Sequence, residues 1–199
     1  KGAKRLKQQQ KPKYKQIIDA AVIVIAEKGY HQSQVSKIAK QAGVADGTIY
    51  LYFKNKEDIL ISLFREKMGL FIEKIEEEIK GKETAKEKLL TLIEKHFSIL
   101  AEDHHLAIVT QLELRQSNLE LRLKINEVLK GYLLLVDSIL QAGIETGELR
   151  EDLDVRLARQ MVFGTIDETV TSWVMNDQKY DLPKLAPKVH NLLINGFGA

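Results

Sequence analysis

Residues 33–56 carry the groups of this chain that are best suited to bind nucleic acid. Two short stretches with helical apolar spacing, 34–41 and 45–52, are separated by the tight turn 42–44, which contains Gly43. Two short helices joined in this way are typical of a helix-turn-helix, whose second helix enters the major groove of DNA. The predicted chemistry is therefore hydrogen bonding to DNA phosphates and base edges.

Some residues of this segment are expected to fix its geometry. Ile38 and Ala39 should pack toward Val44 and Ile49, and Phe53 should lie on the same face as Ile49 because the two are four residues apart. The small side chain of Ala39 permits the two helices to cross closely. The remaining face of the second helix is left for DNA, and it comprises Asp46, Gly47, Thr48, Tyr50, Leu51 and, near the edge, Tyr52.

Two residues on that face are unusual for a helix that binds a polyanion. Gly47 weakens a helix by about 1 kcal/mol relative to alanine, and close approach of the backbone to a phosphate would explain its presence. Asp46 is interpreted as a surface residue favoured by the helix dipole, and acceptance of a hydrogen bond from a cytosine amino group is the alternative.

The ends of these helices provide further polar groups. Ser33 is predicted to cap the helix 34–41, and Asn55 to cap a long helix that has Asp58 at its third position. Lys56 lies in the first turn of that long helix, where a cation meets the positive end of the helix dipole. We interpret Lys56 and the backbone N–H groups beside it as a phosphate site.

The charge distribution supports a polyanionic partner. Residues 1–56 contain 12 Lys and Arg against 3 Asp and Glu, a net charge of +9, whereas residues 57–199 contain 18 against 25, a net charge of −7. Nucleic acid and an anionic membrane surface both fit such an end. The membrane alternative is less favoured because the N-terminal residues lack Trp, Phe and Leu on an amphipathic face.

Composition favours an all-α protein, because Leu, Ile, Lys, Glu and Ala are abundant and only 3 Pro and 12 Gly interrupt them. We predict a disordered basic arm over residues 1–11, a three-helix helix-turn-helix DNA-binding domain over 12–55 and a larger helical ligand-binding and dimerisation domain over 56–199. About nine helices are expected, over residues 12–28, 34–41, 45–52, 55–81, 84–102, 104–116, 119–147, 154–176 and 183–197. The wholly apolar run 132–136 should be buried on every side.

The sequence disfavours an enzyme and a membrane protein. Asp103-His104-His105 is the only cluster that suggests a metal or a general base, but adjacent helical histidines point about 100° apart, so we interpret Asp103 as a helix cap. His96 is interpreted as a core histidine or a pocket-lining one. No cysteine is present and no apolar run approaches the ~18 residues of a membrane span, so a cytoplasmic, DNA-associated protein without cofactor or metal is expected.

The run 29–60, GYHQSQVSKIAKQAGVADGTIYLYFKNKEDIL, resembles the DNA-binding signature of the TetR family of bacterial repressors, above all in its AGV, GTIYLYF and NKE elements. Ser33 stands where that family usually has Thr, and Ala45 where a capping Ser is common. The resemblance implies phosphate contacts from Ser33, Gln34, Ser36, Thr48, Tyr50, Tyr52 and Lys56. It implies groove contacts from Ala45, Asp46 and Gly47.

Members of this family bind palindromic DNA as homodimers, which multiplies the few base pairs that one groove helix reads. The segment 163–174 and the last helix, with Leu185, Val189, Leu192 and Leu193, resemble the paired helices by which the family dimerises. Packing within one chain is the alternative interpretation of both segments.

The runs 106–133 and 158–182 resemble the fatty-acid-degradation repressors of bacilli within this family. That resemblance implies release from DNA by long-chain fatty acyl-CoA, or fatty acid, held in an apolar tunnel with cations at its mouth. Candidate walls are Phe97, Leu100, Ile108, Leu112, Leu133, Phe163, Ile166, Val170 and Trp173. Candidate phosphate partners are Arg115, Arg122 and Lys130. Ordinary core packing of the apolar side chains, and pairing of the cations with nearby glutamates, remain open.

The sequence thus predicts a ligand-responsive transcriptional repressor of fatty-acid degradation genes. The long helix that begins at Asn55 is expected to link DNA reading to ligand binding. The alternatives are a repressor of the same type with another small hydrophobic ligand and, less favoured, a helical enzyme that processes acyl-CoA.

Overall fold

The computed structural model describes residues 12–197, and every regular element in that range is helical. The prediction of an all-α protein is confirmed. The elements are α2 (Pro12–Lys28), α3 (Val35–Gln41), α4 (Asp46–Ile49), α5 (Lys56–Ile79), α6 (Ala85–Glu102), α7 (His104–Glu113), α8 (Leu119–Glu145), α9 (Val155–Met175), the short 3₁₀ helix η1 (Leu182–Leu185) and α10 (Ala186–Phe197). The arm predicted over residues 1–11 lies outside the described residues.

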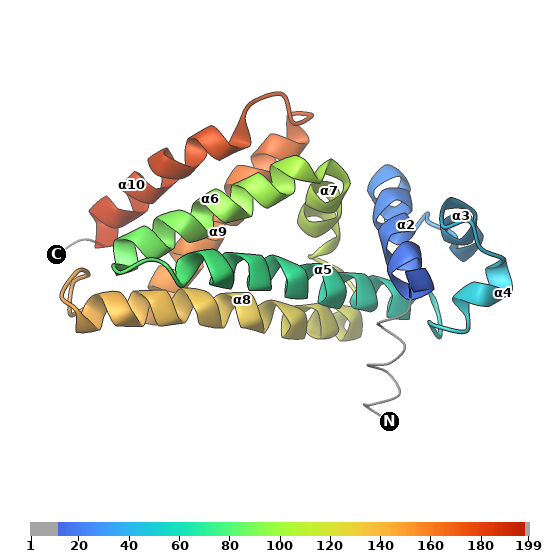
Figure 1. The fold of residues 1–199 in the computed structure, drawn as a ribbon, viewed down its shortest axis with the longest axis horizontal. Coiled ribbons are helices and arrows are strands. Elements are labelled where there is room, and N and C mark those ends of the chain that lie inside the picture. The colour runs from blue at the N-terminus through green and yellow to red at the C-terminus, as the bar shows by residue number, and fades with distance from the viewer. Residues whose placement is uncertain (1–11, 198–199) are drawn as a thin grey trace.

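The helices form a small head and a larger body (Figure 1). Helices α2, α3 and α4 form the head at one end of the molecule, and α10 lies at the other end. Helix α5 leaves the head and runs side by side with α8 through the body, where α6, α7 and α9 pack above them in this view. Helix α7 also packs against α2, so the body contacts the head through two elements.

Side-chain caps fix where several helices begin. The Asn55 Oδ1 atom accepts a hydrogen bond from the Asp58 backbone N–H at 2.8 Å, as predicted, and the Asp58 carboxylate accepts from the Lys54 backbone N–H at 3.1 Å. The Asp103 Oδ1 atom accepts from the Leu106 N–H at 2.9 Å, which confirms its interpretation as a cap. These bonds satisfy backbone donors that have no partner within the first helical turn.

Two predictions about helix ends in the head are wrong. Gln34, not Ser33, is the N-cap residue of α3, and its side chain makes no capping hydrogen bond. The groove helix α4 ends at Ile49 and not near Tyr52, because the N–H groups of Tyr52 and Phe53 both donate to the Ile49 carbonyl and close the chain into a turn. Ala45 precedes α4 without a side-chain cap, as its lack of a polar atom requires.

The prediction that the run 132–136 is buried on all sides is also wrong. Tyr132 and Val136 are buried, but Leu134 is 64% exposed. Helix α8 packs against α5, α6 and α9, and residues two positions from Tyr132 and Val136 fall on the face that these helices leave open. Within the described residues, no helix is long and apolar enough to span a bilayer.

Candidate DNA-reading surface and effector cavity

The geometry of the head rests on side chains that the sequence predicted to be buried. Ile38, Ala39 and Ile49 are fully buried, and Phe53 stacks on the ring of Tyr14 with 5.2 Å between ring centroids. Gly43 has φ +63°, a conformation that favours glycine, and the next N–H, from Val44, donates to the Ala39 carbonyl at 3.0 Å. The turn and the core together hold α4 at a fixed angle to α3.

Most of the predicted DNA contacts lie on one accessible face of the head. Tyr50 is 59% exposed, and Thr48 and Tyr52 are half-buried. The other exposed positions are Gln34, Ser36, Ala45, Asp46 and Gly47. Leu51, which sequence reasoning placed on an outer face without a role, is also exposed beside Tyr50.

Ser33 is not on that face. Its side chain is 3% exposed, and its hydroxyl donates to the Gly29 carbonyl at 2.7 Å and to the Val24 carbonyl at 3.3 Å. The hydroxyl is therefore engaged in closing the turn after α2 and is not accessible to a phosphate, contrary to the prediction.

The role predicted for Lys56 also requires correction. Its ammonium donates to three backbone carbonyls, those of Tyr30 at 2.9 Å, His31 at 3.0 Å and Ser33 at 3.2 Å, and it lies 4.6 Å from the centroid of the Tyr30 ring. An ammonium has three N–H donors, and all three have partners here. Lys56 fastens the start of α5 to the loop between α2 and α3 and is not directed toward a phosphate.

Packing within the protein does not explain why position 47 is a glycine. A Cβ atom added at this position would have no atom within 4 Å, and its backbone does not have the positive φ that favours glycine. Close packing against another part of the protein and a left-handed backbone conformation are thus both excluded as the cause. What the missing side chain leaves is free space above the backbone on the face that would meet DNA.

The body contains a narrow apolar cavity of about 30 Å³ between α5, α6, α7, α8 and α9. Small-molecule sites are about ten times larger, so the side chains that line this cavity must move apart to admit an acyl chain. Of the predicted walls, Leu100 and Phe163 line it. Unpredicted walls come mainly from α5 and α7, and they include Phe64, Met68, Phe71, Leu106 and Leu114.

The other predicted walls lie elsewhere. Four of them are buried in the packed core and do not line the cavity: Phe97 of α6 and Ile166, Val170 and Trp173 of α9. Ile108 and Leu133 are half-buried, and Leu112 is 50% exposed. The α5 walls had a signal in the sequence, because Leu63, Phe64 and Phe71 follow a helical spacing. That spacing indicated a buried face but not what the face contacts.

Of the three predicted cations, only Arg115 lies beside the cavity, because its partner Asp167 lines it. Arg115 pairs with Asp167, Arg122 is exposed, and Lys130 pairs with Glu127 at 2.6 Å on the same helix. The lining cation is instead Lys67 of α5, whose ammonium lies 2.5 Å from the Asp19 carboxylate of α2. A groove that shares Lys67, Phe71 and Leu106 with the cavity also contains Lys74.

A buried polar pair lies beside this apolar space. The His96 Nδ1 atom is 2.9 Å from the Tyr132 hydroxyl, and both side chains are buried. Burial lowers the pKa of His96 to about 3 and raises the pKa of Tyr132. Both groups are therefore neutral at physiological pH. The prediction that His96 is a core or pocket-lining histidine is confirmed, since it also lines the cavity.

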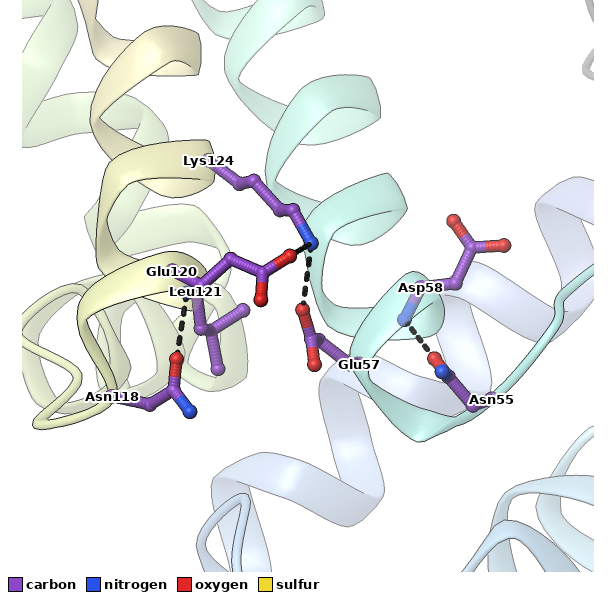
Figure 2. Close-up of polar contacts among 7 residues, drawn as sticks. All are labelled: Asn55, Glu57, Asp58, Asn118, Glu120, Leu121 and Lys124. Atoms are coloured by element: carbon purple, nitrogen blue, oxygen red, sulfur yellow. Dashed lines mark hydrogen bonds and ion pairs between the residues drawn. The ribbon is translucent and has the colours of Figure 1, made fainter.

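Polar contacts connect the body to the head besides those of Lys56. The Glu113 carboxylate, at the end of α7, accepts a hydrogen bond from the Tyr30 backbone N–H at 2.7 Å, and the Gln116 amide donates to the same carboxylate at 2.7 Å. The Lys67–Asp19 pair joins α5 to α2. Within the body, Figure 2 shows Lys124 of α8 between Glu57 in the first turn of α5 and Glu120, at 3.0 and 2.6 Å, so it ties α8 to the start of α5.

Among residues 12–197, no group of three or more His, Cys, Asp or Glu side chains is placed to hold a metal ion. The ring of His104 packs edge-on against Trp173, with 5.5 Å between centroids.

The sequence matches two protein-family models that adjoin along the chain. Residues 17–63 match the model "Bacterial regulatory proteins, tetR family", and residues 64–196 match "YsiA-like protein, C-terminal region". The chain is 77% identical to the "Fatty acid metabolism regulator protein" of Bacillus subtilis (strain 168), over 94% of this chain and 97% of that protein.

Two solved structures are similar over nearly the whole chain. One is the transcriptional regulator FadR from Bacillus subtilis in complex with stearoyl-CoA, with TM-score 0.90, 77% identity, and coverage of 92% of this chain and 99% of that one. The other is the fatty acid degradation regulator FadR from Bacillus halodurans, with TM-score 0.90, 66% identity and the same coverage. Both relatives are regulators. The chain belongs to the TetR family of bacterial transcriptional regulators.

Proposed function

We propose that the chain represses fatty-acid degradation genes, binds palindromic operator DNA as a homodimer, and leaves the DNA when long-chain fatty acyl-CoA occupies the body. The observation that carries this proposal is the course of α5, whose first turn is fastened to the head by Lys56 and whose middle lines the cavity with Phe64 and Phe71. The stearoyl-CoA in the Bacillus subtilis relative supports the ligand class. No resident cofactor is part of the proposal.

On the DNA side, the exposed face of the head supplies the contacts. Hydroxyls of Ser36, Thr48 and Tyr50, with Gln34 and Tyr52, bind phosphates. Ala45, Asp46 and Gly47 lie at the groove, because they begin the helix that enters it. The domain boundary then falls between residues 55 and 56, at the cap of α5.

On the effector side, the acyl chain occupies the apolar cavity. The groove that shares Lys67 with the cavity and also contains Lys74 is the place for the CoA phosphates, because ammonium groups bind phosphate as point charges. Arg115 also lies beside the cavity, because it is bound to the lining residue Asp167, whereas Arg122 and Lys130 have no such position. The proposed phosphate partners are therefore Arg115, Lys67 and Lys74.

The dimer is formed by α9 and α10. These helices contact each other within the chain and still expose apolar side chains: Leu157 and Met161 share a face of α9, and Leu192 of α10 is 74% exposed. Large exposed apolar side chains on adjoining helices are typical of an interface. Gly164, with no atom within 4 Å of an added Cβ, leaves room for close approach by a partner helix.

Coupling between the two sites follows from the contacts that join body and head. An acyl chain that displaces α5 or α7 also displaces the head, since Lys56 and Glu113 bind the loop between α2 and α3 from both helices. In a dimer, such a shift changes the spacing of the two groove helices and weakens DNA binding. The regulator acts in the cytoplasm, on nucleoid DNA.

The test is a gel shift with a palindromic duplex that the protein selects from a random pool. The complex of the protein with this duplex is titrated with palmitoyl-CoA, with free CoA or with free palmitate, over the same concentrations. Palmitoyl-CoA should lower the affinity for DNA and free CoA should not. Unchanged affinity with all three ligands would overturn the acyl-CoA proposal and favour another hydrophobic effector.

Tyr50→Ala is the matched variant for the DNA side. It removes an exposed ring and hydroxyl, so the operator should bind more weakly while palmitoyl-CoA binds as before. Loss of both operator binding and palmitoyl-CoA binding would indicate a misfolded protein. The variant would then no longer support a DNA contact from Tyr50.

A further inference from the structure

The cavity contains one polar group that the protein itself leaves without a partner. Its lining includes five polar side chains, Lys67, His96, Thr110, Gln111 and Asp167. Four of them have partners: Lys67 pairs with Asp19, Asp167 with Arg115, the Gln111 amide bonds Thr171, and the Thr110 hydroxyl donates to the Leu106 carbonyl. Among the described residues, the Nε2 atom of His96 is buried and has no hydrogen-bond partner.

The position of the proton on His96 follows from Tyr132. Burial raises the pKa of the Tyr132 hydroxyl, so it keeps its proton and needs an acceptor. The acceptor found is Nδ1 of His96, at 2.9 Å. Because a neutral imidazole carries one proton, that proton is then on Nε2, and His96 offers an N–H donor from its other edge.

The donor edge is the one that meets the cavity. Tyr132, which occupies the Nδ1 side, is not among the lining residues, whereas His96 is. The ring is held in this orientation by edge-to-face contacts with Phe71 and Tyr132, at 4.9 and 5.5 Å between centroids. An unpaired buried donor is energetically unfavourable, and a ligand acceptor atom can remove that cost.

We propose that the Nε2–H group of His96 donates a hydrogen bond to the thioester carbonyl oxygen of the bound acyl-CoA, and that Tyr132 fixes the tautomer that makes this possible. The inference rests on the function proposed above and specifies what the cavity recognises. A carbonyl is the acceptor that separates an acyl-CoA from a hydrocarbon or an alkyl thioether of equal length. His96 is therefore a specificity-determining residue, and Tyr132 a positioning residue.

The experiment compares two ligands that differ only in the carbonyl, palmitoyl-CoA and its thioether S-hexadecyl-CoA, by isothermal titration calorimetry on the full chain. The wild type should bind the thioester about 10-fold more tightly, as expected for one hydrogen bond of about 1.4 kcal/mol. In the double variant His96→Phe/Tyr132→Phe, which removes donor and acceptor together, the preference should fall to about 1. His96→Gln, whose amide can replace the Nε2–H donor, should retain most of it.

Tyr132→Phe alone leaves the His96 tautomer free, so the thioester preference should decrease without being abolished. His105→Gln, at an exposed histidine of α7, is the matched control and should behave as wild type. Equal binding of the two ligands by the wild type, or an undiminished preference in the double variant, would overturn the inference while leaving the proposed effector class intact. Failure of both ligands to bind the wild type would overturn the proposed function as well.

Discussion

The backbone N–H of Tyr30 donates to the carboxylate of Glu113, 2.7 Å away and 83 positions later in the sequence. Tyr30 lies in the loop after α2, in the head, and Glu113 is the last residue of α7, which lines the cavity through Leu106, Thr110 and Gln111. The same loop receives Lys56 from α5. The DNA-reading head is thus bound by two helices that line the cavity, α5 and α7.

Removing the Glu113 carboxylate should weaken communication between effector and operator. Hydrogen bonds to charged groups contribute about 1.5–3 kcal/mol, so Glu113→Ala should reduce the ratio of operator dissociation constants with and without palmitoyl-CoA by ~10-fold or more. Fluorescence anisotropy with labelled operator measures this ratio. Glu127→Ala, at an exposed pair on α8, is the control. An unchanged ratio in Glu113→Ala would exclude this contact from the coupling.

Lys56 should support the head without contacting phosphate. Each Lys–phosphate contact contributes a slope of about −0.9 to the dependence of log K on log salt concentration. Lys56→Met removes three hydrogen bonds and should lower both the stability of the head and its affinity for operator, but the salt slope should stay as in wild type. A slope smaller by about 1 would restore Lys56 as a phosphate ligand.

Gly47→Ala should change stability and DNA affinity in opposite directions. The added methyl meets no protein atom, and alanine favours a helix over glycine by about 1 kcal/mol, so the midpoint of chemical unfolding should not fall. Operator affinity should fall because the methyl occupies the space that the DNA backbone requires. Gly143→Ala, whose Cβ would lie 2.7 Å from Leu149, should lose stability instead. Unimpaired operator binding by Gly47→Ala would remove Gly47 from the interface.

A charged side chain introduced on α9 tests the proposed dimer interface. Met161 is 48% exposed on α9, so burying a glutamate there against a partner is costly, whereas in a monomer it would stay in solvent. Met161→Glu should yield a monomer by light scattering and a large loss of operator affinity. Leu123→Glu, at an exposed leucine of α8, should remain dimeric. A dimeric Met161→Glu would place the interface elsewhere.

His96 should make the protein less stable in acid. Its pKa is about 3 in the fold and about 6.5 in an unfolded chain, so between these values the unfolded state binds more protons. Its contribution is complete above pH 6.5 and is lost as the pH falls toward 3. Lowering the pH from 7.5 to 5 should cost about 2 kcal/mol of unfolding free energy through this residue.

His190 has a lowered pKa too, so the measurement is the difference between wild type and His96→Gln in urea unfolding at each pH. The variant should show a pH dependence that is weaker by that amount. Parallel curves for the two proteins would mean that His96 is accessible to protons in the fold.

The sequence alone determined the DNA-reading head. The pairing of α3 and α4 depends on neighbours within 20 residues: Ile38, Ala39 and Ile49 are buried together, Gly43 makes the turn, and Asn55 caps α5. Apolar spacing, a left-handed turn residue and a cap are local signals, so they can be recognised without the rest of the fold. The same holds for the all-helical class, which follows from composition and period.

Only the tertiary structure decided the roles of Lys56 and Ser33. Their residue types fit phosphate contacts as well as internal hydrogen bonds, and the choice depends on carbonyls that the fold brings close, at Tyr30 for Lys56 and Val24 for Ser33. The cavity required the fold for the same reason. It is assembled from five helices, and the spacing of Phe64 or Trp173 predicts a buried face without saying whether that face meets packed core or open space. Local periodicity encodes burial, and long-range packing determines what lies opposite.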